Sequence, residues 1–166
     1  MIELLRRRPG RSLLVVALVA VLLVTLWVRY VTTNTTTTTV AAGQSGTSAG
    51  VAWRLDSIRA NRGYVNYLGE AETPLAGASF VVVHFTYTVV NAERADCSWA
   101  WLQGAGRQWS TAAGSSSTHD GFEMYCKDGG TVELIYEVPT SALPEITGVL
   151  ISNGPQTQVF LQGRPT

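Results

Sequence analysis

Apolar and polar residues alternate along two segments in the second half of the chain. In residues 80–90 one alternate set consists of valine, phenylalanine and tyrosine, and the other set includes a histidine and two threonines. This period of two, in β-branched and aromatic residues, predicts a half-buried strand that ends at Asn91. Residues 131–138 follow the same alternation, and Pro139 ends it because proline lacks the N–H that a sheet ladder needs.

Six shorter segments have a similar composition and are separated by glycine-containing turns. They are residues 52–59, 98–103, 107–111, 121–126, 147–152 and 157–161. Apart from a single turn around residues 140–143, no stretch with helical periodicity follows the N-terminal segment. Seven or eight short strands of this kind predict an all-β domain, an antiparallel β-sandwich, over residues 51–166.

The N-terminal segment has a different pattern. Residues 1–11 contain four arginines and one acid, and residues 13–28 are apolar except for Thr25. Counted from Ser12, the 17 residues of this run would span roughly 26 Å as a helix, close to the thickness of a hydrocarbon core. We therefore predict one transmembrane signal-anchor helix over residues 12–31, behind a basic cytoplasmic tail, because arginines favour the cytoplasmic side.

A cleaved signal peptide is the alternative interpretation of this segment. A cleavage site of small residues would have to follow the apolar run closely, but Trp27, Arg29 and Tyr30 stand there, and the nearest small residues lie at 41–43. We therefore favour an uncleaved anchor. The protein is then a single-pass plasma-membrane protein with a cytoplasmic N-terminus and an extracytoplasmic C-terminal domain.

Residues 32–50 separate the predicted anchor from the predicted domain. They are mostly threonine, then alanine, glycine and serine, and they carry no charge. Because this stretch shows neither helical nor strand periodicity, we interpret it as a flexible linker. Its 18 residues from Thr33 would have an end-to-end distance of about 23 Å. Asn34 begins a formal glycosylation sequon, although an unmodified spacer is the favoured interpretation.

The composition and charge exclude several classes of protein. With 46% hydrophobic residues the chain is too apolar to be disordered throughout. Its formal net charge of zero argues against a basic nucleic-acid binder. Beyond the predicted anchor, seven basic residues face eleven acidic ones, so the domain carries a net charge of −4. An acidic domain of this kind is not held on anionic lipids by electrostatic attraction.

Two of the predicted strands resemble a known family. FVVVHFTYTVVN (80–91) resembles the long strand of a family of bacterial surface domains of unknown function, and GTVELIYEVP (130–139) resembles that family's glycine, strand and Val-Pro segment. The resemblance implies a telokin-like, immunoglobulin-like sandwich that follows a lipoprotein or membrane anchor, mainly in Gram-positive bacteria. It also implies an envelope-exposed module that recognises a partner. The family has no established catalytic residues, so no role is carried over to a position in this sequence.

Cys97 and Cys126 are the only two cysteines, and both fall in the domain that we place outside the membrane. An oxidising compartment favours a disulfide between them. Closing a loop of about 30 residues would stabilise the domain by roughly 3.6 kcal/mol if the stabilisation is entropic. A redox or metal pair is the weaker alternative, because the two cysteines lack the Cys-x-x-Cys spacing.

We predict no catalytic residue, no metal site and no cofactor. His84 falls on the polar face of its strand, where a solvated or cross-strand histidine is the ordinary expectation. The alternative is a metal or acid–base site made by His119, Asp120 and Glu123 beside the serines at 115–117. The same residues are common in loops of glycine and serine, where they favour turns and solubility.

Aromatic side chains supply the candidate binding residues. Trp99 and Trp101 are two residues apart and therefore share one face of a strand, and Trp109 follows closely. Tyr64 and Tyr67 lie in a segment with glycine and proline, where rings displayed over a rigid sandwich would form a binding patch. A tryptophan pair on one strand face is more often part of the core than a contact surface, so the core is the favoured interpretation of Trp99 and Trp101. For the two tyrosines, packing onto the sheet is an equal alternative to a binding patch.

These observations predict a non-enzymatic, membrane-anchored binding module of the cell envelope. Its partners would be membrane lipid, through the N-terminal helix, and an envelope protein, a polymer or a small ligand, but no nucleic acid. The main alternative is an accessory subunit of a membrane complex, in which the helix makes specific contacts. A secreted ligand-binding protein and a hydrolase that uses His119 and Asp120 are the remaining alternatives.

Overall fold

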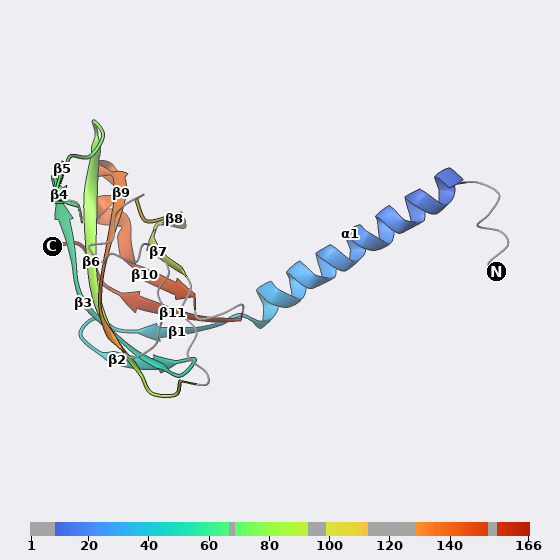
Figure 1. Cartoon of the computed structure of the whole chain (residues 1–166), viewed down its shortest axis with the longest axis horizontal. Coiled ribbons are helices and arrows are strands. Elements are labelled where there is room, and N and C mark those ends of the chain that lie inside the picture. The colour runs from blue at the N-terminus through green and yellow to red at the C-terminus, as the bar shows by residue number, and fades with distance from the viewer. Residues whose placement is uncertain (1–8, 67–68, 93–98, 113–128, 153–155) are drawn as a thin grey trace. The chain divides into compact units, whose positions relative to one another are not determined.

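The computed structural model describes residues 9–66, 69–92, 99–112, 129–152 and 156–166 (Figure 1). The chain divides into two compact units, Met1–Thr35 and Thr36–Thr166. Within the first unit, one helix, α1 (Pro9–Asn34), is the only described element long and apolar enough to cross a membrane. Its apolar window is Leu13–Tyr30, with a mean hydropathy of 2.5, and none of that window is buried.

Two polar side chains of α1 find hydrogen-bond partners within the helix itself. The Thr25 hydroxyl donates to the carbonyl oxygens of Val21 and Leu22, at 2.9 and 2.8 Å. At the C-terminal end, the side-chain amide of Asn34 donates to the Tyr30 carbonyl at 2.9 Å. An apolar environment would therefore leave no hydrogen-bonding group of the Thr25 side chain without a partner, which is the condition for a residue inside a bilayer.

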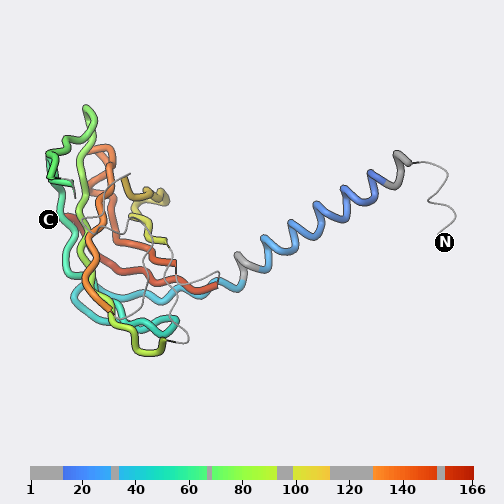
Figure 2. The backbone as a smooth tube through the Cα atoms, viewed as in Figure 1, coloured from blue at the N-terminus to red at the C-terminus, as the bar shows by residue number. Residues whose placement is uncertain are grey.

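Among the described residues, nine strands of the second unit form two facing sheets and two more form a hairpin (Figures 1 and 2). The five-stranded sheet has the order β1-β11-β10-β7-β8, and the four-stranded sheet has the order β2-β3-β6-β9. The strands are β1 (Thr36–Val40), β2 (Ser45–Ser48), β3 (Val51–Asn61), β4 (Tyr64–Val65), β5 (Ala71–Glu72), β6 (Ala78–Val89), β7 (Trp99–Gly104), β8 (Arg107–Trp109), β9 (Gly130–Pro139), β10 (Ile146–Ser152) and β11 (Thr157–Gln162).

The sequence predicts one apolar N-terminal helix followed by a β-sandwich, and the structure confirms both. The two alternating segments form β6 and β9, which pair antiparallel from Ala78 opposite Pro139 to Tyr87 opposite Gly130. A short 3₁₀ helix, η2 (Thr140–Glu145), follows β9 where a single helical turn was expected. The predicted strand at 121–126 lies outside the described residues. One pair departs from the antiparallel expectation, because β1 runs parallel to β11.

The predicted linker over residues 32–50 is wrong for most of its length. The helix continues to Asn34, and the threonine run forms β1, which pairs with β11 along all five of its residues. Most of the β1 side chains remain exposed and only Val40 is buried, so the segment shows no apolar alternation in sequence. Backbone pairing with a distant strand makes it a strand, and threonine's β-branched side chain is compatible with that role.

Side chains from both sheets meet in one central core. Trp53 is fully buried, and its ring lies 5.9 Å from that of Phe85 and 5.7 Å from that of Tyr87, measured between centroids. Inward positions of the other sheet supply further buried residues, among them Leu102, Ile151 and Leu161. Alternate positions on these strands therefore point away from the core, and they form the outer face of each sheet.

Tyr136 contributes a polar group to the core that is costly to bury. Its side chain is fully buried, and among the described residues its hydroxyl has no hydrogen-bond partner. Burial raises the pKa of Tyr136 far above its ordinary value of 10.0. Above pH 10 the unfolded chain therefore ionises this group while the folded chain does not, so stability declines as the pH rises.

We expect Tyr136→Phe to keep or slightly increase stability at pH 7, by up to about 1 kcal/mol, because it removes an unpaired polar atom. Above pH 10, one such tyrosine makes the free energy of unfolding fall by up to about 1.4 kcal/mol per pH unit. Tyr136→Phe should remove this contribution, so stability should decline less steeply with pH. Urea denaturation at pH 7 and at several alkaline pH values measures both effects. A marked loss of stability at pH 7 would instead show that the hydroxyl has a partner.

Candidate functional site

The outer face of the five-stranded sheet carries aromatic side chains. Trp99 begins β7 and is 52% exposed, and Trp101, two residues further, is half-buried on the same face. Neither belongs to the central core, whereas Ala100 and Leu102 between and after them do. The prediction that the two tryptophans share one strand face is confirmed, and the interpretation of the pair as core residues is wrong.

Cross-strand register extends this surface over three adjacent strands. Trp101 in β7 lies opposite Leu150 in β10, and Leu150 lies opposite Phe160 in β11. Leu150 and Phe160 also stand outside the central core, while their neighbours in sequence belong to it. We call Trp99, Trp101, Leu150 and Phe160 the aromatic face.

Leu150 is only 7% exposed although it points outward, and its two register neighbours on this face are a tryptophan and a phenylalanine. The Phe160 ring is itself held over Gly148: a Cβ atom at Gly148 would lie 2.9 Å from two carbons of that ring and against the Leu161 carbonyl. Only glycine leaves this space for the ring. Within the aromatic face, the position of the Phe160 ring therefore depends on the glycine at position 148.

The remaining predicted patch residues lie elsewhere. Trp109 in β8 pairs with Leu102 and packs against the central core. Tyr64 in β4 packs edge-on against Phe80, with the ring centroids 4.8 Å apart and the planes at 85°. Tyr67 lies outside the described residues. The four predicted residues that the structure describes thus do not form one patch, and Tyr64 follows the alternative in which the tyrosine packs onto the sheet.

Tyr64 belongs to a small cluster on the outer face of the four-stranded sheet. Its neighbours there are the buried residues Phe80, Val82 and Ile135. Burial raises the pKa of Tyr64 above its ordinary value, and the carboxylates of Glu72 and Glu137 raise it further. Tyr64 of the β4–β5 hairpin therefore covers the apolar half of this outer face.

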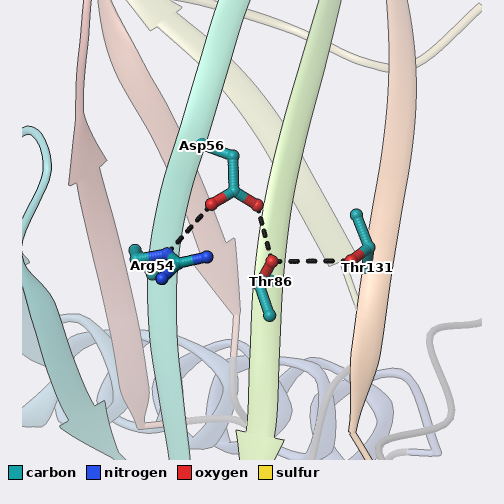
Figure 3. A network of polar contacts seen from close by, with 4 residues as sticks. All are labelled: Arg54, Asp56, Thr86 and Thr131. Carbon is teal, nitrogen blue, oxygen red and sulfur yellow. Dashed lines mark hydrogen bonds and ion pairs between the residues drawn. The ribbon is translucent and has the colours of Figure 1, made fainter.

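The uncovered half of the same face is polar and charged (Figure 3). The Asp56 carboxylate accepts hydrogen bonds from the Arg54 side chain at 2.9 Å and from the Thr86 hydroxyl at 2.6 Å, and the Thr86 and Thr131 hydroxyls are 3.5 Å apart. A register shift between Leu55 and Ser57 places Asp56 within reach of these partners. The network joins β3, β6 and β9 and is the ordinary cross-strand pairing of a solvated sheet.

His84 lies next to this network, on the polar face where the sequence predicts it. Its Nε2 atom is 2.7 Å from the Glu133 carboxylate, its register neighbour in β9. In the described part of the chain, no three histidine, cysteine or acidic side chains are grouped so as to hold a metal ion. Predictions for Cys97, Cys126, His119, Asp120, Glu123 and the serines at 115–117 concern positions outside the described residues.

Sequence reasoning missed Leu150 and Phe160, although both belong to the aromatic face. For Phe160, the alternation of residues along its segment could have shown this, because Phe160 lies between Val159 and Leu161, which are both buried. That alternation states that Phe160 points away from the core. It does not state that Trp101 lies two strands away in the same row, since register depends on pairing between distant segments.

No protein-family model matches this chain, and no curated protein matches it as a relative. Two solved structures are similar to the sandwich. An uncharacterised β-sandwich protein from Clostridium difficile 630 has 8% identity and a TM-score of 0.49, with 78% of this chain and 96% of that chain covered. A conserved hypothetical protein from Bacillus anthracis has 8% identity and a TM-score of 0.50, with 68% and 87% covered. At 8% identity, the similarity to the Bacillus anthracis protein shows a shared fold alone.

Proposed function

We propose that this chain is a non-enzymatic, membrane-anchored binding module of the cell envelope, and that it binds its partner through the aromatic face. The N-terminal helix α1 is the anchor, with the arginine-rich tail in the cytoplasm and the sandwich outside. The length and hydropathy of the window Leu13–Tyr30 support a membrane span. The four arginines before it support this orientation, because arginines are retained on the cytoplasmic side.

The observation that carries the binding role is the outward row of Trp101, Leu150 and Phe160 with Trp99 beside it. The outer face of a solvated sheet is usually polar, as the four-stranded sheet of this protein is around Asp56 and His84. Tryptophan and phenylalanine provide large contact areas at a low cost in side-chain entropy, and tryptophan is enriched among residues that dominate binding energy. A flat aromatic surface supplies contact area rather than a nucleophile or an acid–base pair.

Site-specific photocrosslinking in intact cells tests the proposal. We expect p-benzoylphenylalanine at position 101 to give a reproducible adduct, whether with protein, glycan or lipid, because its photoexcited ketone would lie against the bound partner. The ketone oxygen takes a hydrogen atom from a C–H bond of the partner, and the two carbon radicals then combine. The matched control carries the same group in place of Thr88, an exposed position of β6 in the other sheet. Equal labelling from both positions, or no adduct from position 101, would contradict binding at the aromatic face.

A further inference from the structure

A cavity lies at the edge of the four-stranded sheet, at the point where β3 changes its partner. β2 pairs with β3 only as far as Arg54, which lies opposite Ser45. Further along β3 the C-terminal segment after β11 takes this place, and the Thr166 N–H donates to the Ile58 carbonyl at 3.1 Å. Between these two contacts, no described strand pairs with residues 55–57 on this side of β3, and the register shift of β3 against β6 falls at the same place. This interruption leaves a cavity of about 360 Å³.

Apolar side chains form part of the cavity wall. Leu55 and Ile58 line it and belong to the central core, with exposed fractions of only 8% and 3%. The C-terminal segment lies directly against them, because a Cβ atom at Gly163 would overlap the Leu55 side chain and lie 3.2 Å from the Cδ1 atom of Ile58. Small-molecule sites are of this kind: about 300–1,000 Å³ in volume and mostly apolar, with a few polar groups that fix the ligand.

Two arginines also line the cavity, Arg59 from β3 and Arg164 from the C-terminal segment. Neither has an acidic partner among the described residues, where the two ion pairs use Arg54 and His84 instead. The domain as a whole carries a net charge of −4, so acidic side chains are not scarce. Two guanidinium groups without a counterion therefore share one cavity in an acidic domain.

The cavity has one side-chain carboxylate in its lining, that of Asp56, and this group is already engaged (Figure 3). Its two oxygens accept hydrogen bonds from the Arg54 side chain at 2.9 Å and from the Thr86 hydroxyl at 2.6 Å. Thr86 belongs to β6, which pairs with the side of β3 opposite to the C-terminal segment. The charge of Asp56 is therefore offset by Arg54, and the two arginines of the cavity stay without compensation.

From the cavity, its apolar wall and its two uncompensated arginines we infer that this site binds a small organic ligand through an oxyanion, either a carboxylate or a phosphate group. A guanidinium group donates two parallel hydrogen bonds to either oxyanion. Ser57, also in the lining, supplies a hydroxyl group beside the arginines. The apolar part of the ligand packs against Leu55 and Ile58. The site shares no residue with the aromatic face, so this inference goes beyond the proposed function and does not depend on it.

A nuclear magnetic resonance titration of the full chain in an uncharged detergent, at pH 7 and constant ionic strength, tests this inference. The probes are butyrate, butyl phosphate and inorganic phosphate, and the readout is the Nε–H signal of each arginine. We expect saturable shifts for Arg59 and Arg164 with an organic probe. Inorganic phosphate should bind severalfold more weakly, because it has no apolar part to bury. The organic probe that binds more tightly identifies the oxyanion.

Substitutions of single arginines test the role of each guanidinium group. Arg59→Gln and Arg164→Gln should each weaken binding of the tighter organic probe about tenfold or more, because hydrogen bonds between charged groups are lost. Arg107→Gln is the matched control, since Arg107 is an exposed arginine of β8 outside the cavity, and it should leave binding unchanged. Arg59→Lys/Arg164→Lys keeps both charges but lacks the planar fork, and it should weaken binding severalfold.

Three results would overturn the inference. Equal binding by the double-lysine variant and the unmodified chain would show that only diffuse attraction of an anion is involved. Shifts of the Arg107 signal as large as those of Arg59 and Arg164 would show an adventitious ion only. Absence of a saturable shift with all three probes would mean that the cavity is not an oxyanion site. Photocrosslinking from position 101 reports on the aromatic face alone, so failure of one proposal is recognised separately from failure of the other.

Discussion

Replacing Trp53 with alanine is expected to lower the free energy of unfolding of the sandwich by about 3–5 kcal/mol, the usual range for removing a large aromatic side chain from a packed core. Trp53 is fully buried at the centre of the four-stranded sheet, where it lies opposite Tyr87 in the register of β3 and β6. Its ring contacts those of Phe85 and Tyr87 at centroid distances of 5.9 and 5.7 Å. Alanine would lose these contacts and leave a cavity that the surrounding strands cannot close.

Urea denaturation of the full chain in a mild detergent, followed by far-ultraviolet circular dichroism of the strands, measures this loss. Trp53→Phe should lose less, because a ring remains and the indole N–H, which has no hydrogen-bond partner among the described residues, is removed. Val90→Ala, at an exposed position next to the end of β6, is the control and should change stability by about 0.5 kcal/mol or less. A loss below about 1 kcal/mol for Trp53→Ala would place the centre of the core elsewhere.

Replacing Val40 with aspartate should destabilise the sandwich by about 3–5 kcal/mol, since a carboxylate would be buried there without a partner. Val40 is 4% exposed at the end of β1, lies opposite Leu161, and packs so closely over Gly46 that a Cβ atom there would overlap its side chain. These contacts join the first strand to the last strand and to β2. The same residue in a flexible linker would tolerate any side chain.

The adjacent Ala41 provides the control for this prediction. It is exposed, so Ala41→Asp should change the free energy of unfolding by no more than about 0.5 kcal/mol. Thermal unfolding followed by tryptophan fluorescence distinguishes the two variants. Equal stability of Val40→Asp and Ala41→Asp would restore the interpretation of this segment as a linker.

The candidate site shows what a local sequence pattern can predict and what it cannot. The spacing of Trp99 and Trp101 predicts a shared strand face, because successive side chains on a strand point to opposite sides. The same spacing is silent on which side is the core. Burial of Ala100 and Leu102 in the central core settles this, and that core is built from side chains of both sheets. Tyr64 is a contrasting example. The glycine and proline around it suggested a loop that displays the ring to a partner, whereas the ring packs against Phe80.

The sequence by itself determined the elements whose own side chains carry the pattern. These are the apolar helix around Leu13–Tyr30, the two long alternating strands β6 and β9, and the β-sandwich class that follows from many short strands. Each rests on local physics: hydropathy over a membrane-length window, or apolar residues at every second position.

Only the tertiary structure decided which segments pair and which faces are covered. The threonine run becomes β1 because β11, more than a hundred residues later, offers it backbone partners, and the row from Trp101 to Phe160 exists because three strands align in one register. Both results depend on hydrogen bonds between distant parts of the chain. Backbone groups are the same in every residue except proline, so their pairing leaves no mark in the local order of side chains.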